Sequence, residues 1–500
     1  MNKQLLHVSV AALVLLAALI VSTTYWQTWA VGDLADRQDN SIQLVSRLTV
    51  DRGKILAGGR VLATNRRHRK HGLTIFTRRY PSGALAPQVI GYATAAGTTT
   101  GLEETLDDYL TGANTNLTNT FKEELRKLGG QTVHGDNVIL TLRPAVQALA
   151  LQELAGRCGA VVALDAKTGA VYAMASSPTY DANLIEQPKG FGQVVKIKGT
   201  CGDSSALVNN ATAGLYPPGS TFKLITASAA LDTGAYTPTS QFYDPGYCVE
   251  YGQRVYNSSA PDSPSGHETF GNVDFSSALE HSINAVFCKI GMHIGAKTIL
   301  EYAKRYGFYS LPPLDLPPTA INASGLYAKG RLHYPKDFNT VDVGRLAFGQ
   351  EKMLVTPLQM ALVAAGVANG GTIMEPHLVK KVTAPGGSKT VAKTKPKVWK
   401  HAMKPSTAAT LNTMMQAVIT GGTATGVQIP GITWAGKTGT AETCDHCNVY
   451  DAWFIFFAPA DHPVVAGAVV IEHSVGGFGG AVAAPIAKQL VQAILPTPSK

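Results

Sequence analysis

The first hydrophobic segment of the chain is long and almost uninterrupted. It runs from Leu5 to Trp26, contains one histidine and ends in aromatic residues. A segment of this length can cross a bilayer, and "YWQTW" is preceded by no small-residue cleavage site. The pattern therefore favours an uncleaved signal anchor over a removed signal peptide. With Lys3 on the cytoplasmic side, the rest of the chain is expected outside the cytoplasm, tethered to the cell membrane by this single helix.

Shorter alternating patterns follow the apolar segment. Residues 29–136 contain two strand-like pieces, "SIQLVSRLTV" and "HGLTIFTRRY", and a small helical signal at "GLEETLDDYLTG". These patterns predict a mixed N-terminal region of strands and short helices.

From Asn137 the pattern changes. "NVILTLRPAVQALALQELAG" predicts a strand followed by an amphipathic helix, and "CGAVVALDAKTGAVYAMAS" predicts two strands joined at a turn. Near the C-terminus, "GITWAGKTGTAE", "DAWFIFFAPA" and "PVVAGAVVIEH" predict three strands before the helix "AAPIAKQLVQAIL". "APGGSKTVAKTKPKVWK" is interpreted as a hairpin and a basic connector. Strands at both ends of a helical middle predict an α+β fold, with a helical subdomain packed on an antiparallel sheet.

Composition and charge limit the class of protein. A chain of 500 residues that is 45% hydrophobic can form a large core in two or three domains. We interpret the net charge of +9 as spread along the chain, with one dense run, "RRHRKH", from Arg66 to His71. No aromatic interleaving or nucleic-acid motif accompanies this run, so we expect no nucleic-acid partner. A solvated basic loop near anionic lipid or wall polymer is favoured.

Six cysteines fit an exported chain. The spacing of Cys444 and Cys447, in "CDHC", suits a metal site, a redox pair or a small disulfide. We favour a local disulfide over a zinc site, because a structural zinc needs four ligands. Cys201 and Cys248 lie in turn-rich stretches and could pair. Cys158 and Cys288 lie in apolar segments and are interpreted as buried thiols. We expect neither a metal nor a cofactor.

The stretch "GLYPPGSTFKLITA" places two prolines and a glycine directly before Ser220. We expect Ser220 to be the N-cap of a helix that ends at Gly234, with Lys223 one turn later on the same face. A lysine with a lowered pKa can activate a serine, and the backbone N–H groups of a helix start can stabilise an oxyanion. An ordinary capped helix is the alternative for this stretch alone.

Two further tripeptides follow in an informative order. "ALEHSINAVFCKIG" contains Ser282, Ile283 and Asn284, and "WAGKTGTAE" contains Lys437, Thr438 and Gly439. Ser-x-x-Lys, Ser-x-Asn and Lys-Thr-Gly in this order form the motif set of penicillin-binding proteins and serine β-lactamases. A second Lys-Thr-Gly, at residues 167–169, precedes the serine. We assign it to a hairpin turn.

On these motifs the chain resembles a class B penicillin-binding protein, a monofunctional peptidoglycan D,D-transpeptidase. The resemblance extends to "VVALDAKTGAVYAMASSPTYDAN", to "GQEKMLVTPLQMALVAAGVANGG" and, near the N-terminus, to "DRGKILAGGRVLA", "YPSGALAPQVIGY" and "TGLEETLDDYLTG". One departure is "GGR" at Gly58 to Arg60, where the family usually has an acidic or Asn-Gly turn. This departure concerns only the geometry of that turn.

The resemblance implies a penicillin-recognising transpeptidase fold, in which helices flank an antiparallel five-stranded sheet beside an all-helical subdomain. It implies three parts: residues 1–28 as a cytoplasmic stub and transmembrane anchor, residues 29–136 as a non-catalytic domain of the pedestal or dimerisation type, and residues 137–500 as the transpeptidase domain. It also implies stem peptides and β-lactam antibiotics as ligands, and a membrane-embedded glycan polymerase and division proteins as partners.

The resemblance also assigns a role to each motif residue. Ser220 would attack the penultimate D-alanine of a stem peptide, with Lys223 as base. Ser282 would relay the proton to the leaving D-alanine, and Asn284 would bind the substrate amide and orient Lys223. Lys437, Thr438, Gly439 and Thr440 would bind the substrate, mainly through its terminal carboxylate. The backbone N–H groups of Ser220 and Thr440 would form the oxyanion hole.

Other functions share some of these motifs. A class A β-lactamase deacylates through a glutamate between the second and third motifs, and no glutamate lies between Glu301 and Glu351. A D,D-carboxypeptidase would use water as acceptor. A β-lactam sensor should carry a signalling domain, whereas only Met1 to Gln4 precede the apolar segment. A divisome scaffold would not need all the motif residues intact.

Overall fold

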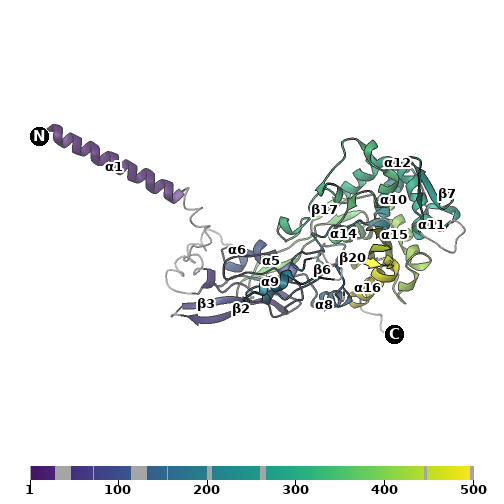
Figure 1. Ribbon diagram of the computed structural model, residues 1–500. Helices are drawn as coiled ribbons and strands as arrows, with labels where there is room; N and C mark the ends of the chain where they lie inside the picture. The colour runs from purple at the N-terminus through teal and green to yellow at the C-terminus, as the bar shows by residue number, and fades with distance from the viewer. Residues whose placement is uncertain are drawn as a thin grey trace.

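We describe a computed structural model of the chain. The structure describes residues 2–28, 47–70, 73–113, 132–154, 156–199, 205–258, 266–443 and 448–495. Helix α1 (Asn2–Thr28) is drawn apart from the rest in Figure 1 and contains one candidate membrane span, Leu6–Tyr25, with a mean hydropathy of 2.3. By length and composition, this helix fits the expected membrane anchor.

The core of the larger part of the molecule is a five-stranded antiparallel sheet in the order β18-β19-β20-β5-β6. Its strands are β18 (Ala435–Glu442), β19 (Val449–Ala458), β20 (Val465–Val475), β5 (Gly159–Leu164) and β6 (Val171–Ser177). The central strands are hydrophobic throughout because both faces of the sheet are covered. Helices α8 (Pro144–Leu154) and α16 (Gly479–Ile494) pack on one face, and α14 (Pro357–Ala368) packs on the other. The predicted α+β fold is confirmed.

A helical region lies beyond the α14 face of this sheet (Figure 1). Its helices are α10 (Lys223–Asp232), α11 (Phe275–Glu280), α12 (Asn284–Arg305), α13 (Val343–Leu346) and α15 (Pro405–Thr420). Short strands also occur here, which the sequence did not predict: β7 (Gln241–Asp244), β8 (Tyr247–Glu250), β9 (Gln253–Tyr256), β10 (Gly271–Asp274), β11 (Gly325–Ala328), β12 (Arg331–Leu332) and β13 (Met353–Leu354).

A second sheet of six strands has the order β16-β15-β4-β1-β2-β3. It combines β1 (Ile55–Ala57), β2 (Arg60–Lys70) and β3 (Leu73–Arg79) with β4 (Asn137–Leu140), β15 (Val379–Thr383) and β16 (Thr390–Lys393). Strand β4 pairs in parallel with β1 and antiparallel with β15. The sheet therefore crosses the expected boundary at residue 137, and the division into domains stays a prediction.

Several local predictions can be compared with this sheet. The hairpin β15–β16 confirms the expectation for "APGGSKTVAKTKPKVWK", and β17 (Val398–His401) then pairs with β14 (Thr372–Met374). The turn at "GGR" joins β1 to β2 through Gly58 and Gly59, both with positive φ, as a two-residue hairpin turn requires. The expected strand "SIQLVSRLTV" is wrong in its described part, because residues 47–50 form a helical turn and a bend.

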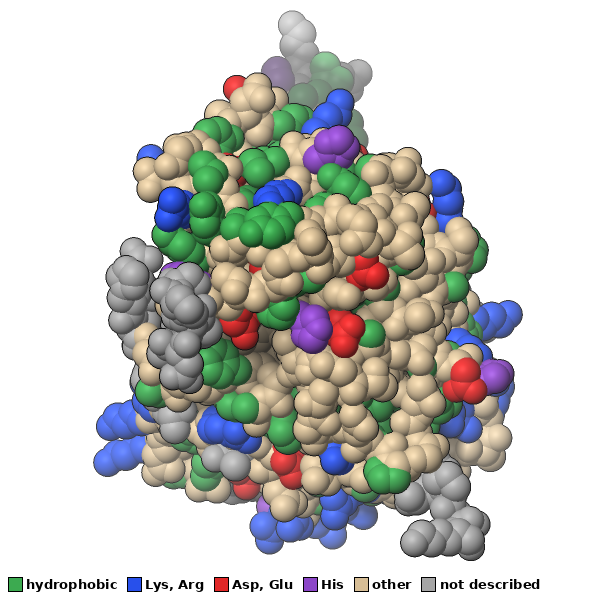
Figure 2. Space-filling model, turned by 90° about the vertical axis from the view of Figure 1, so that its right-hand side faces the viewer, with side chains coloured by type: hydrophobic (Ala, Val, Ile, Leu, Met, Phe, Trp, Pro, Cys, Tyr) green, Lys and Arg blue, Asp and Glu red, His purple; other side chains and the backbone are tan. Residues whose placement is uncertain are grey.

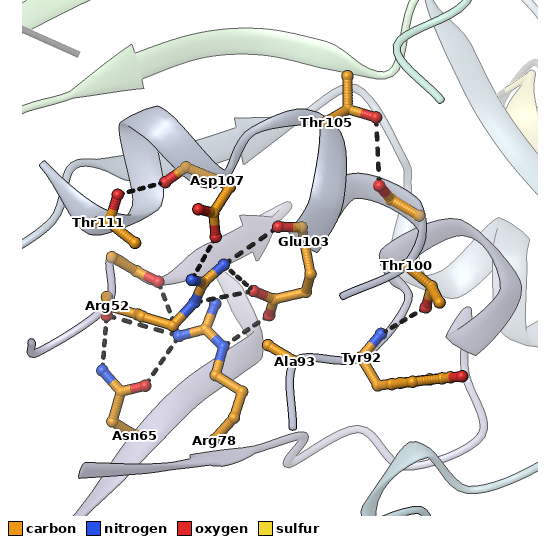
Figure 3. Close-up of polar contacts among 12 residues, drawn as sticks. Arg52, Asn65, Arg78, Tyr92, Ala93, Thr100, Glu103, Thr105, Asp107 and Thr111 are labelled. Atoms are coloured by element: carbon orange, nitrogen blue, oxygen red, sulfur yellow. Dashed lines mark hydrogen bonds and ion pairs between the residues drawn. The ribbon is translucent and has the colours of Figure 1, made fainter. Parts of the chain in front are cut away.

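A buried ion-pair network holds the N-terminal part together (Figure 3). Glu103, at 0% exposure, lies in α5 (Gly101–Thr105) and accepts hydrogen bonds from Arg52 at 2.9 Å and from Arg78 at 2.6 Å. Asp107, in α6 (Asp107–Thr111), binds Arg52 at 2.6 Å. The helical signal of "GLEETLDDYLTG" is thus confirmed as two short helices whose acidic residues fix the start of β1 against β3.

The disulfide prediction was wrong in part. Cys248 on β8 is bonded to Cys288 on α12, with 6.4 Å between their Cα atoms, so neither the Cys201–Cys248 pair nor a free Cys288 thiol exists. Cys158 is also disulfide-bonded. Burial in apolar segments suggested thiols, but spacing along the chain says nothing about which cysteines meet in space. Cys201, Cys444 and Cys447 lie outside the described residues.

Candidate active site

Ser220 lies in a tight turn that two other segments hold in place. It is half-buried in a 3₁₀ turn, η2 (Gly219–Phe222), and α10 begins only at Lys223, so the predicted N-cap is wrong. Residues three apart are eclipsed in a 3₁₀ helix, so Ser220 and Lys223 still lie on one side. Gly219 has φ +50° and donates its N–H to the Gly349 carbonyl at 3.2 Å.

The Lys223 ammonium is enclosed by the second motif. The residue is fully buried, and its Nζ donates hydrogen bonds to the Ser282 carbonyl, to Ser282 Oγ at 3.2 Å and to Asn284 Oδ1 at 2.8 Å. Burial lowers the pKa of Lys223 well below its usual value, and the positive charge of Lys437 lowers it further, while Glu268 acts in the opposite direction. A neutral amine at this position can accept a proton.

Ser282 lies at the corner between α11 and α12. Its φ of 61° is unusual for a residue with a side chain, and its N–H donates to the Leu279 carbonyl at 3.2 Å, which closes the corner. Its hydroxyl receives hydrogen bonds from Lys223 and, at 2.8 Å, from Lys437. The hydroxyl therefore connects the two lysines and can pass a proton between groups on either side.

The third motif lies on β18, the edge strand of the five-stranded sheet. Lys437 is fully buried, and burial lowers its pKa to about 7. Thr438 Oγ1 lies 2.6 Å from Thr423 Oγ1, and Thr440 Oγ1 accepts the Gly479 N–H at 3.3 Å, at the start of α16. A Cβ atom on Gly439 would come within 2.9 Å of the Pro218 carbonyl oxygen, so only glycine fits against the serine turn here.

The structure thus brings the three motifs together at one place. Within the described residues the hydrogen bonds of the Lys223 ammonium go to the second motif and not to Ser220. The serine turn meets β18 closely, since a Cβ atom on Gly219 would lie 2.9 Å from the Thr440 carbonyl oxygen. The first Lys-Thr-Gly lies elsewhere, in the β5–β6 turn, where Asp165 Oδ1 accepts the N–H groups of Lys167 and Thr168.

Several residues that shape this site carry no local signal in the sequence. Asn257 is buried, and its Oδ1 accepts the N–H of Ala285 at 2.9 Å, next to Asn284 in the first turn of α12. Asp244 accepts the Asn257 side chain at 2.8 Å, and Asn284 Nδ2 donates to the Tyr256 carbonyl at 3.2 Å. Thr423, which contacts Thr438, and Glu268, whose charge acts on Lys223, were also not predicted. All act across long sequence separations, which local motifs do not reveal.

No group of three His, Cys, Asp or Glu side chains in the described part of the chain could hold a metal ion. The Cys-Asp-His-Cys stretch at residues 444–447 lies outside that part.

The model for the penicillin binding protein transpeptidase domain matches residues 159–492, and the model for the penicillin binding protein A dimerisation domain matches residues 52–138. The chain is 33% identical to the peptidoglycan D,D-transpeptidase PbpA of Mycolicibacterium smegmatis, over 99% of each chain. It is 29% identical to the peptidoglycan D,D-transpeptidase MrdA of Acinetobacter baumannii, over 83% of this chain and 65% of the relative. The ceftriaxone acyl-enzyme of penicillin-binding protein A from M. tuberculosis superposes with a TM-score of 0.77 at 31% identity, covering 90% of this chain and 100% of that one.

Proposed function

The chain belongs to the penicillin-binding protein transpeptidase family, as a class B member, and on this premise we propose that it is a penicillin-sensitive serine D,D-transpeptidase that cross-links peptidoglycan stem peptides. One observation carries the proposal. A fully buried Lys223 with a lowered pKa lies between the serine turn and Ser282, whose hydroxyl a second buried lysine also contacts.

Acylation begins at Ser220. Its Oγ attacks the carbonyl carbon of the penultimate D-alanine, and the neutral Lys223 amine takes the hydroxyl proton. The negative charge moves to the carbonyl oxygen, where the backbone N–H groups of Ser220 and Thr440 stabilise it. Removal of one such donor typically reduces the rate about a hundredfold or more.

Collapse of this intermediate releases D-alanine. The peptide C–N bond breaks, and the proton taken by Lys223 passes through the Ser282 hydroxyl to the leaving nitrogen. The distance of 3.2 Å between Lys223 Nζ and Ser282 Oγ supports this relay. Asn284 binds the substrate amide and keeps Lys223 in place. Lys437 supplies positive potential for the terminal carboxylate, and the Thr438 and Thr440 hydroxyls donate to it beside Gly439. The ester is then attacked by an amine of a second stem peptide, which forms the cross-link.

The decisive experiment separates transpeptidation from hydrolysis. The purified protein is incubated with a stem peptide that ends in D-alanyl-D-alanine, with and without an acceptor amine, and the products are identified by mass spectrometry. We expect a cross-linked product with the acceptor and none with Ser220→Ala. Release of D-alanine at the same rate without any cross-linked product would instead indicate a D,D-carboxypeptidase.

The catalytic part is proposed to lie outside the cytoplasm. A candidate membrane span near the N-terminus and the Cys248–Cys288 disulfide both support this location, because disulfides persist in oxidising compartments. A protease added to intact spheroplasts should degrade the catalytic part and leave the anchor. Full protection from the protease would contradict this topology.

A membrane-embedded glycan polymerase is the proposed partner. Only about a hundred residues lie between the apolar helix and Asn137, which leaves little room for a glycan-polymerising domain and supports a separate enzyme as the source of the strands that are cross-linked. The contacts are assigned to α1 and the N-terminal part. Polymerisation of lipid-linked precursor by the purified protein alone would refute this proposal.

A further inference from the structure

The excess positive charge of the chain is concentrated in the segment that contains the dense run Arg66–His71, and is not otherwise spread along the chain as expected. Residues 52–102 contain nine Lys and Arg and no Asp or Glu. All other residues together contain 34 Lys and Arg and 34 Asp and Glu, so they carry no formal net charge. The opposite end of the molecule, seen in Figure 2, shows acidic and basic side chains scattered together.

Most of this segment forms one long antiparallel hairpin. Strand β2 pairs with β3 from Thr64 opposite Arg79 to Lys70 opposite Leu73, and the ribbon extends from the six-stranded sheet as its edge (Figure 1). Arg66, Arg67 and Arg69 are exposed, and so is Leu73, at 50%. We call these four residues the hairpin end.

The arginines of the hairpin end have no acidic partner among the described residues. The acidic groups at the base of the hairpin are already engaged there: Glu103 and Asp107 bind Arg52 and Arg78, and Asp51 accepts a hydrogen bond from Asn65. Because side chains alternate along a strand, Arg66 lies on one face of the ribbon and Arg67 and Arg69 lie on the other. The positive charge therefore surrounds the hairpin end and does not form a one-sided patch.

The first residues described after the membrane anchor lie beside this hairpin. The chain enters the described domain at Arg47, and Arg47 and Leu48 line one cavity with Phe76 and Thr77 of β3. Eighteen residues separate Thr28, the end of α1, from Arg47, and a chain of that length spans at most about 60 Å. The hairpin thus belongs to the end of the domain that stays near the bilayer.

We propose that the hairpin end binds the headgroup layer of an anionic lipid membrane. Charge on both faces favours headgroups over a protein partner, because a protein surface would meet one face of a ribbon, whereas a lipid layer surrounds its end. The exposed Leu73 can enter the layer while the long arginine side chains remain at the headgroups. Each basic residue near an anionic membrane contributes about a fivefold gain in binding, and high salt removes it.

The test uses the full chain in nanodiscs of phosphatidylcholine alone, or of equal parts phosphatidylcholine and phosphatidylglycerol. Hydrogen–deuterium exchange is followed by mass spectrometry on peptides that cover residues 60–79. We expect exchange to be several-fold slower in the anionic nanodiscs, and the difference to vanish in high salt and in the triple variant Arg66→Gln, Arg67→Gln, Arg69→Gln.

A matched variant removes the same charge elsewhere: Lys389→Gln, Lys393→Gln, Lys395→Gln, all exposed on or next to β16. It should keep the lipid-dependent protection, and both variants should bind penicillin normally because neither touches the site. Equal exchange in the two lipids would overturn the proposal. So would protection that appears in neutral nanodiscs only when a soluble anionic wall polymer is added.

Discussion

The ammonium nitrogen of Lys223 lies 2.8 Å from the amide oxygen of Asn284, a residue that is 61 positions further along the chain. An amide oxygen accepts this hydrogen bond without adding a negative charge to the buried lysine. The contact therefore orients the amine and adds no negative charge that would oppose the lowering of its pKa by burial.

The first prediction is that Asn284→Asp moves the pH dependence of acylation to higher pH. A carboxylate would favour the ammonium form, so the pKa of Lys223 would rise and less of it would be neutral at a given pH. Because only the neutral amine accepts the Ser220 proton, the acid limb of the rate profile should shift upward. The measurement is the second-order rate constant for labelling by a fluorescent penicillin across pH. Asn339→Asp, on an exposed turn, is the charge-matched control.

An Asn284→Asp profile that coincides with that of the parent protein would show that Asn284 does not influence the proton acceptor.

The sequence predicted the elements near the site better than their contacts. The strands around Lys437 and the Lys167 turn followed from alternation and turn residues, which are local signals. The contact between Lys223 and Asn284 was expected only through the family resemblance, because periodicity carries no information on tertiary neighbours. The position of Ser220 in a 3₁₀ turn was missed, since Pro-Gly-Ser also fits a capped α-helix.

Long-range pairing explains the larger errors. Strand β4 pairs with β15 across more than two hundred residues, and Cys248 meets Cys288 because β8 packs beside α12. Hydrophobic patterning shows which residues are buried but not which buried segments meet. The residues of the site that were missed, such as Asn257, depend on the same kind of contact.

The second prediction distinguishes the two Lys-Thr-Gly tripeptides. Lys437→Ala should weaken penicillin labelling severely because it removes a buried cation from Ser282, whereas Lys167→Ala should leave labelling near normal. Ser220→Ala should abolish labelling. Mass spectrometry of the labelled protein locates the adduct. Equal damage from the two lysine variants would show that the assignment of the tripeptides is wrong.

The third prediction concerns the disulfide that ties α12 to β8. The double variant Cys248→Ala, Cys288→Ala should lower stability, by about 4 kcal/mol on loop-closure grounds for a separation of 40 residues. It should also slow acylation, because Asn284 begins the helix that Cys288 anchors one turn later. Variants are preferable to a reductant because Cys158 is disulfide-bonded as well. A lower melting temperature with an unchanged acylation rate would limit the bond to a stabilising role.

The fourth prediction concerns the ion-pair network of Figure 3. Glu103→Gln leaves the buried Arg78 without its carboxylate and leaves Arg52 paired only with Asp107, and breaking a buried pair typically costs about 3–5 kcal/mol. Asp107→Asn should cost far less, because the Asp107 side chain is 47% exposed. Thermal unfolding followed by circular dichroism compares the two variants. Similar melting temperatures for both would show that burial of the pair is not what stabilises this part.

The last prediction concerns the lifetime of the penicillin adduct, for which the position of Glu268 is relevant. A bound penicilloyl group is released only when a base activates water, and such help is worth roughly a hundredfold to ten-thousandfold in rate. The span from Tyr302 to Gln350 contains no glutamate, but the structure adds Glu268, whose charge acts on Lys223. Burial raises the pKa of Glu268, and the positive charges of His281 and Lys223 oppose that rise.

We predict that Glu268 does not serve as this base and that penicillin stays on Ser220 for many minutes, which would make the protein a drug target and not a resistance enzyme. The intact mass of the acylated protein is followed after free drug is removed, for the parent chain and for Glu268→Gln. Lys223 is already engaged by Ser282 and Asn284, so it is not free to activate water, and neither protein should lose the adduct quickly. If Glu268 is not the base either, the adduct lifetimes of the two proteins should agree. Loss within seconds in the parent chain, slowed strongly by Glu268→Gln, would instead identify a β-lactamase with Glu268 as its deacylating base.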